Sequence, residues 1–256
     1  SLLVDDRGAV WVGHFQAGLD YSLYQNGLFR TYAYPPLFNS ANLSIRSFVN
    51  RGQEKVIGSR DGLFYINEAT GVVKSFVKPV LTSDLILTIS FYQGEYYIGT
   101  YGGGMMVLNP GTLSLKYFAQ GDTELFQKGH IFCVKPDAKG NLWIGTSQGL
   151  FCYNGQTKQI KHFTSANSQL PEGNVYEVSF DSTGKGWIAT ETGMCIYDPA
   201  SQSLRSNVFP EGFVHRDKVR TIYEDAGHNL YFIREKGSLF TSTLTMDRFQ
   251  NRSIFS

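Results

Sequence analysis

The pentapeptide GTSQG at residues 145–149 is the first stretch of the sequence that could carry out chemistry. It matches the G-x-S-x-G nucleophile elbow of hydrolases, in which Ser147 would be the nucleophile. That elbow requires a strand that turns sharply into a helix, with an acid and then a histidine later in the chain. The residues that follow, FCYNG from position 151, instead resemble another strand. The pattern therefore favours a structural role for Ser147 over a catalytic one.

Two carboxylates, Glu191 and Glu235, occupy the same position in two similar loops. Because a pair of acids is the usual machinery of glycoside hydrolysis, an enzyme acting on carbohydrate, glycosidase-like or a lyase, stays open as an alternative. Arg60 and Tyr101 hold the same position in other copies of the loop, however. This variation favours binding over catalysis, and we expect no catalytic residue in the chain.

The histidines and cysteines show no spacing typical of a metal site, since HExxH, CxxC and i, i+4 histidine pairs are all missing from the sequence. We therefore expect neither a metal nor another cofactor. The cysteines Cys133, Cys152 and Cys195 lie in apolar, strand-like runs, where small buried side chains with free thiols are expected.

A repeat explains why the strings NLWIGT and KGWIAT resemble each other. Six segments align on one apolar or aromatic anchor followed by small residues, and the anchors lie 41 to 46 residues apart, with a mean of 44. A fixed period of this length is the signature of a repeat architecture. The anchors are Trp11, Val56, Tyr97, Trp143, Trp187 and Tyr231.

Each unit contains four short strand-like segments separated by turns, which predicts an all-β protein, a β-propeller of about six four-stranded antiparallel blades of about 44 residues. The chain begins inside the first strand of a unit and ends soon after a fourth-strand segment. We therefore expect a fragment of a larger region, and the six blades either close a ring or belong to a seven-bladed ring, the favoured arrangement. A single propeller over 1–256 would have blades at 1–40, 41–82, 83–128, 129–172, 173–216 and 217–256.

The turns between first and second strands share the pattern DxxG. Asp137 and Asp181 can accept backbone hydrogen bonds, while Gly140 and Gly184 supply the positive φ that a tight reversal needs. The sixth unit places His228 in the glycine position. We expect that turn to differ in detail, together with the turn of the second unit, which has Asn in place of Asp.

One end of the predicted blades departs from the repeat. The connections from fourth to first strands differ in length and composition. Loops that are not needed to hold the fold together are where binding residues are commonly found. The position after the small residue of the second strand lies at the same end. A ligand site there would use aromatic rings to stack on a sugar and charged groups to hold hydroxyls or a uronate, from Phe15, Arg60, Tyr101, Glu191 and Glu235.

Composition excludes several other functions. With 23 basic and 22 acidic residues the net charge is +1, so we expect no contact with nucleic acid. Because uninterrupted apolar runs never approach about 18 residues, we also expect no contact of this chain with a membrane.

The recurring D-x-x-G-x-x-W-I-G-T-x-x-G-L-x-x-Y-[DN], clearest over 137–154 and 181–198, resembles the two-component-regulator propeller repeat. That repeat occurs in the periplasmic sensor regions of hybrid two-component systems of Bacteroidetes. The resemblance covers essentially the whole chain. The motif is distinct in the first, fourth and fifth units and degraded in the others.

The resemblance implies a non-enzymatic periplasmic sensing domain, the extracytoplasmic part of an inner-membrane receptor. Its ligand would be an oligosaccharide, and its signal would reach a histidine kinase and a transcription regulator elsewhere in the full-length chain. The implied partners are the remaining sensor repeats, an immunoglobulin-like domain of the same receptor, and a second copy in a homodimer. A protein-interaction scaffold is the other alternative.

Overall fold

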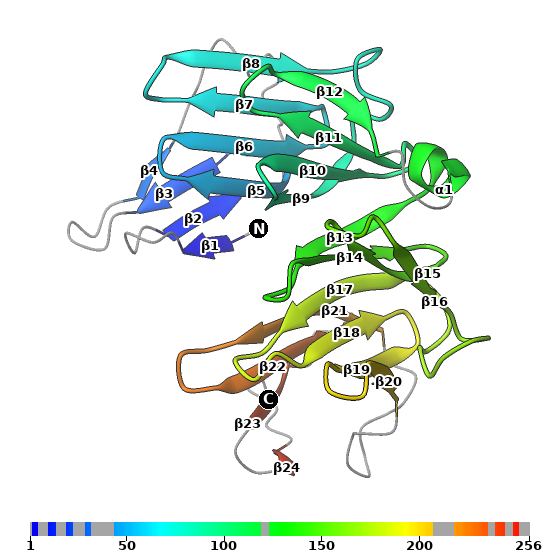
Figure 1. The fold of residues 1–256 in the computed structure, drawn as a ribbon. Coiled ribbons are helices and arrows are strands. Elements are labelled where there is room, and N and C mark those ends of the chain that lie inside the picture. The colour runs from blue at the N-terminus through cyan, green and yellow to red at the C-terminus, as the bar shows by residue number, and fades with distance from the viewer. Residues whose placement is uncertain are drawn as a thin grey trace. The chain divides into compact units, whose positions relative to one another are not determined.

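The structure is a computed structural model that describes residues 2–4, 10–13, 19–22, 29–31, 44–118, 123–206, 218–234, 239–243 and 248–250. Within these ranges the strands form six antiparallel sheets, each made of four consecutive strands in chain order (Figure 1). The predicted all-β class and the predicted four strands per unit are therefore confirmed.

The chain divides into two compact units, Ser1–Ile131 and Phe132–Ser256. The first unit contains three sheets and the helix α1 (Thr123–Lys128). Its strands are β1 (Leu2–Val4), β2 (Val10–Gly13), β3 (Leu19–Ser22), β4 (Phe29–Thr31), β5 (Ile45–Arg51), β6 (Glu54–Ser59), β7 (Leu63–Asn67), β8 (Val72–Phe76), β9 (Ile86–Tyr92), β10 (Glu95–Thr100), β11 (Met105–Asn109) and β12 (Ser114–Tyr117).

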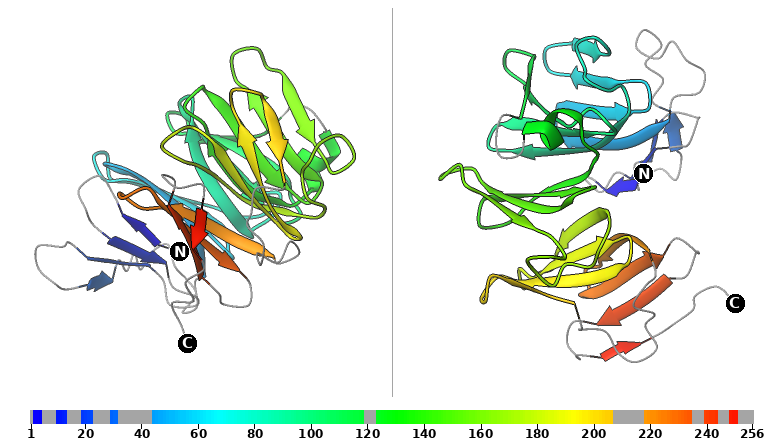
Figure 2. Two further views of the ribbon diagram at one scale, coloured as in Figure 1. Left: turned by 90° about the horizontal axis from the view of Figure 1, so that it is seen from below. Right: turned by 90° about the vertical axis from the view of Figure 1, so that its right-hand side faces the viewer.

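The second unit contains the other three sheets of the described residues, and its boundary falls at the first residue of β13. The further views in Figure 2 again show each run of four consecutive strands lying side by side. The strands are β13 (Ile131–Pro136), β14 (Asn141–Thr146), β15 (Gly149–Asn154), β16 (Ile160–Phe163), β17 (Val175–Phe180), β18 (Gly186–Thr190), β19 (Gly193–Asp198), β20 (Ser203–Arg205), β21 (Val219–Glu224), β22 (Asn229–Arg234), β23 (Leu239–Thr243) and β24 (Arg248–Gln250).

Each of the six sheets lies inside one of the six predicted segments. The limits of those segments, the single propeller over residues 1–256 and the number of blades in its ring stay predictions.

Neighbouring sheets within a unit pack face to face through apolar side chains. In the first unit Val56 and Tyr65 from one sheet share a core with Tyr96 and Ile98 from the next. The second strand of one sheet lies close to the first strand of the following sheet. A Cβ on Gly58 of β6, for example, would clash with the side chain of Ile86 on β9. Glycine at this repeat position therefore permits the close packing of consecutive sheets.

The predicted anchors of the second unit lie between sheets. Trp143 is 1% exposed and packs on Tyr197 of the next sheet, with ring centroids 4.5 Å apart. Trp187 is 4% exposed and its ring lies 5.7 Å from that of Phe232 on β22. Val56 and Tyr97 are also buried, Tyr231 is half-buried, and the side chain of Trp11 lies outside the described residues. Burial is thus confirmed for four described anchors, and Tyr231 is buried only in part.

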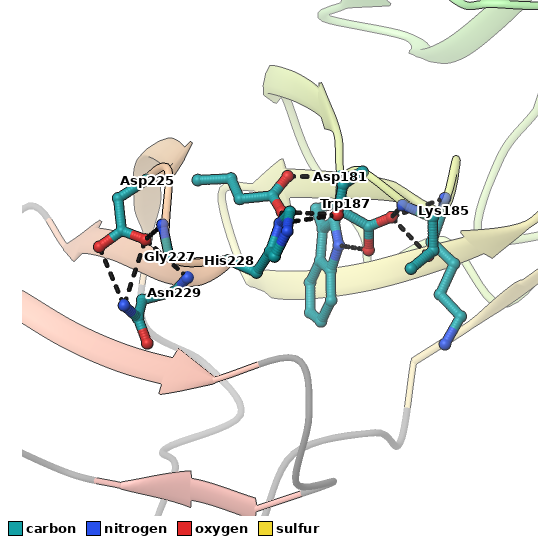
Figure 3. Close-up of polar contacts among 10 residues, drawn as sticks. Asp181, Lys185, Trp187, Asp225, Gly227, His228 and Asn229 are labelled. Atoms are coloured by element: carbon teal, nitrogen blue, oxygen red, sulfur yellow. Dashed lines mark hydrogen bonds and ion pairs between the residues drawn. The ribbon is translucent and has the colours of Figure 1, made fainter.

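A hydrogen bond, buried for Trp187 and partly buried for Trp143, joins each tryptophan of the second unit to the DxxG turn before it. The carboxylate of Asp181 accepts from the indole Nε1 of Trp187 at 2.8 Å, and its other oxygen accepts from two backbone amides of the turn (Figure 3). Asp137 and Trp143 repeat this arrangement at 2.9 Å. The Asp-to-Trp spacing of the repeat is therefore the spacing of one structural bond.

The two turns expected to differ do so in different ways. His228 occupies the glycine position with φ of 62°, while Asp225 accepts from the hydroxyl of Tyr231 at 2.9 Å. Hydrogen bonds, first from the side chain of Asn229, lower the pKa of the Asp225 carboxyl to about 2, so this turn keeps its carboxylate far into the acidic range. In the second sheet Glu54 takes over as acceptor, from the hydroxyl of Tyr65 at 2.7 Å.

The helix α1 is the main element that the sequence did not predict. It lies in the connection from β12 to β13, which was expected to be an irregular loop. Leu125 and Phe126 are fully buried, and the ring of Phe126 packs at 5.0 Å on Phe118. This connection therefore contributes to the core as well as to the variable end.

All three cysteines are free in the structure, as predicted. Cys152 lies opposite Trp143, whereas Cys195 lies opposite Ile188 and not opposite Trp187, so the two occupy opposite faces of their own sheets. Burial raises the pKa of Cys133 and of Cys152 to about 12, and it raises the pKa of Cys195 as well. The thiols are therefore protonated and unreactive at neutral pH.

Replacing Trp187 by Ala should lower the free energy of unfolding by roughly 3 to 5 kcal/mol, because it removes a buried ring between two sheets. Thermal and urea unfolding followed by circular dichroism would measure this loss. Tyr117→Ala, at a ring 47% exposed on β12, is the control and should cost less than about 1 kcal/mol. An unchanged melting curve for Trp187→Ala would contradict the assignment of the anchors.

Titration of the unfolded protein with a thiol reagent should find three free groups, while the native protein should react slowly at neutral pH because its thiols are buried. Recovery of a single thiol after unfolding would reveal a disulfide and refute the expectation.

Candidate functional site

A buried hydroxyl fixes the loop between the second and third strands in four of the sheets. The hydroxyl of Thr146 donates to the carbonyl of Gly149 at 2.9 Å, and Thr190 donates to Gly193 at the same distance. Ser59 and Thr100 make the equivalent bonds to Gly62 and Gly104, at 3.0 and 2.9 Å. In these four sheets the backbone position of the residue that follows the hydroxyl is therefore fixed. We call this following residue the slot residue: Arg60, Tyr101, Ser147 and Glu191.

The backbone N–H of a slot residue bonds to the carbonyl of the residue just before the first strand of the same sheet. Arg60 donates to Ser44 at 3.0 Å, and Glu191 donates to Asn174 at 2.9 Å. Tyr101 makes the same bond to its counterpart at 3.0 Å. In these sheets the slot and the fourth-to-first connection therefore meet at one end, as the sequence predicted.

The first strand carries a β-bulge beside the slot in four sheets of the described residues. The pairing register shifts by one residue there, so that one residue of the first strand is left unpaired with the second. Bulges of this kind redirect a side chain and are common beside functional sites. Sequence analysis missed them, because a bulge leaves the apolar pattern of a short strand nearly unchanged. The extra residues are Arg46, Leu87, Tyr176 and Arg220.

Tyr101 presents the best-defined aromatic surface of the first unit. Its side chain is 50% exposed and stacks on the ring of His130, with centroids 4.0 Å apart and an interplanar angle of 27°. Its carbonyl accepts a hydrogen bond from Ser83 at 2.9 Å, and the next loop residue, Gly102, has φ of 76°. The loop therefore holds the ring at the surface on a fixed backbone, which suits stacking against a flat ligand.

Glu191 lies in a polar cluster of the second unit. One carboxylate oxygen accepts from the backbone of Asn174 at 3.4 Å, and the other lies 4.0 Å from the ammonium of Lys218. Lys218 and Arg220 also lie over the ring of Tyr176, at 5.0 and 4.5 Å from its centroid. The bulge and slot residues thus bring an acid, two cations and an aromatic ring together.

The structure describes three of the five predicted ligand residues. Arg60 and Tyr101 are exposed at slot positions of the first unit, and Glu191 holds the same position in the second. Phe15 and Glu235 lie outside the described residues. That these residues form one ligand site stays a prediction.

Ser147 is not part of a nucleophile elbow. The loop after β14 leads directly into strand β15, and its hydroxyl-bearing neighbour Thr146 is used to hold the hairpin. The strand-to-helix turn that the elbow needs is therefore replaced by an ordinary β-hairpin.

A serine, a histidine and an acid do meet at the opposite end, between the turns β17–β18 and β21–β22. The hydroxyl of Ser182 donates to Glu224 at 2.9 Å and lies 3.0 Å from Nδ1 of His228. Glu224 lies 2.8 Å from the same nitrogen. A catalytic triad places the acid and the serine on different nitrogens of the histidine ring. Here both contact Nδ1, so these three side chains join the two turns and do not activate Ser182 as a nucleophile.

Other kinds of site find no support in the part of the chain that the structure describes. Within it, no cluster of three or more His, Cys, Asp or Glu side chains could hold a metal ion. The same residues contain no helix that is long and apolar enough to cross a membrane.

Four-stranded antiparallel sheets in chain order, each packed on the next within its unit, define a β-propeller protein, and solved structures support that class. The β-propeller domain of Myceliophteria thermophila Cps50 (Swd1) matches with a TM-score of 0.69 at 11% identity, over 97% of this chain and 84% of that one.

Two further structures are each described as the extracellular domain of a hybrid two component system from B. thetaiotaomicron. BT3049 matches with a TM-score of 0.73 at 24% identity over 98% of this chain, and BT4673 with 0.75 at 17% over 100%. This chain spans 33% of the length of each.

A sequence-family model agrees with the resemblance. Residues 126–148 match the family described as two component regulator propeller. This confirms the predicted resemblance to that repeat. The matched segment contains β13, the DxxG turn and β14, which are the elements joined by the bond from Asp137 to Trp143. Comparison with curated proteins gave no match.

Proposed function

We propose that this chain is a ligand-sensing propeller segment of the extracytoplasmic region of a hybrid two-component receptor. The match of residues 126–148 to the two component regulator propeller family carries the proposal, and the extracellular domains with the same fold support it. In this reading the chain lies in the periplasm and the kinase and transcription regulator lie elsewhere in the full-length protein.

The ligand proposed is a glycan fragment bound at the slot end. Tyr101 offers an exposed ring for stacking on a sugar, and Arg60 and Glu191 offer charged groups at equivalent positions. Binding shifts signalling only through its different affinity for the two receptor arrangements. The remaining repeats, an immunoglobulin-like domain and a second receptor copy are the proposed partners in that change.

An enzyme acting on carbohydrate remains the alternative function, but the structure weakens the two observations that suggested it. The G-x-S-x-G stretch at Ser147 is a hairpin, as the sequence pattern favoured, and Glu191 is engaged with Asn174 and Lys218. The sensing function accounts for the exposed aromatic ring without requiring a reaction.

Tyr101→Ala and Arg60→Ala, made in the intact receptor, should each raise the concentration of cognate glycan needed for half-maximal transcription by about tenfold or more, because each removes a ligand contact. Reporter dose–response curves would measure the shift.

The matched controls are Tyr117→Ala and Arg205→Ala, whose side chains are also exposed but lie on the outer strands β12 and β20. These variants should respond like the unmodified receptor. Unaltered dose responses in both slot variants, with normal protein levels, would exclude the slot end as the ligand site. Appearance of a cleaved glycan product would favour the enzyme instead.

A further inference from the structure

Two hollows adjoin between the sheets β13–β16 and β17–β20 of the second unit. Their volumes are about 400 and 410 Å³, and both are lined by Lys161, Phe163 and Gln202. Each lies within the range of about 300 to 1,000 Å³ usual for small-molecule sites. We call the pair the side groove. It is separate from the slot residues and bulges described above.

The inner wall of the side groove is aromatic. Trp143, Phe163 and Tyr197 line its deeper hollow. The ring of Trp143 lies 4.5 Å from that of Tyr197 and is stacked at 5.9 Å on that of Phe163. Because these rings come from both sheets and hold one another, the wall is fixed before any ligand arrives.

Several polar groups along the groove are available to a ligand. Within the described part of the chain, the hydroxyl of Tyr197 and the side-chain amides of Gln159 and Gln202 make no hydrogen bond to protein. Amides and phenols both donate and accept, so they suit hydroxyl groups of a sugar. Gln202 also has φ of 52°, a conformation uncommon for a residue other than glycine.

The charged side chains that line the groove are lysines, and the carboxylate of Asp137 lies behind the lining residues Asn141 and Trp143, to which it is hydrogen-bonded. Lys139 and Lys161 line it, and no Asp or Glu does. Their ammonium groups reach backbone carbonyls of the facing sheet, Pro199 at 3.4 Å and Gln202 at 3.5 Å, and neither forms an ion pair with a described carboxylate. Lys161 also lies over the ring of Phe163, 4.7 Å from its centroid. These two cations therefore lack the partner that an acidic ligand would supply.

We propose that the side groove binds an acidic saccharide, with Lys139 and Lys161 holding its carboxylate or sulfate and Tyr197, Gln159 and Gln202 holding its hydroxyls. This rests on the proposed sensing function and goes beyond it, because it adds a second saccharide site away from the slot residues. The groove is formed by β16 on one side and the β19–β20 turn on the other, so an occupant contacts two sheets at once.

The test uses the full 256-residue chain and three trisaccharide or disaccharide probes: trigalacturonate, a chondroitin sulfate disaccharide and the neutral galactose trisaccharide. Calorimetry should show binding of at least one acidic probe, about tenfold or more tighter than the neutral one and weakening with added salt. In an NMR spectrum, the indole N–H signal of Trp143 should shift on binding. The signal of Trp187 should not shift, because Trp187 lies on the face of the β17–β20 sheet that points away from the groove.

Lys139→Gln and Lys161→Gln should each weaken binding of the acidic probe about tenfold or more, since each removes a charge-assisted contact but keeps much of the side-chain length. Lys185→Gln, at an exposed lysine on the turn β17–β18, is the matched control and should leave binding unchanged.

Failure of both acidic probes to bind would contradict the proposed site, and so would binding by both lysine variants that is as tight as binding by the unmodified chain. Full displacement by equimolar inorganic sulfate would also overturn it as a saccharide site. These results are independent of the receptor assay. Binding of an acidic probe to the groove without any reporter response of the intact receptor to that probe would instead count against the sensing function.

Discussion

The hydrogen bond from a tryptophan indole to the aspartate of the preceding turn is the interaction on which the rest of the structure depends. In Asp181 and Trp187 it joins a side chain that organises the turn to a ring that fills the space between two sheets. One bond therefore fixes both the hairpin and its packing on the next sheet. Asp137 and Trp143 repeat it, and Asp225 with Tyr231 preserves it with a phenol as donor.

This bond and the hydroxyl bonds of the hairpins hold the fold of each repeat, so the side chains of the slot residue and of the bulge residue can vary. The slot residue changes from Arg60 to Tyr101 to Glu191 while its backbone bond to the strand entry stays the same. The bulge beside it changes from Arg46 to Tyr176 without changing the sheet. A constant backbone with variable side chains would allow repeats of this kind to present different binding groups on one scaffold.

Sequence predicted the parts of this protein that repeat, and missed those that depend on one copy. The period, the four strands, the buried anchors and the turn aspartates all recur, so each copy supports the others. The helix at Thr123–Lys128 interrupts a single connection, and its short amphipathic run resembles a loop. The bulges leave the apolar pattern intact, and the side groove arises between two sheets from residues such as Lys139 and Gln202 that are far apart in the chain. Such contacts follow from tertiary packing, which a linear pattern does not encode.

A double-mutant cycle between Asp181 and Trp187 tests the central claim most directly. Unfolding free energies would be measured for Asp181→Ala, Trp187→Phe and the double variant. If the buried bond links turn and packing, the two changes should be coupled by about 1 kcal/mol or more, since a hydrogen bond to a charged group contributes about 1.5 to 3 kcal/mol. Additive losses, with coupling below about 0.3 kcal/mol, would contradict the account.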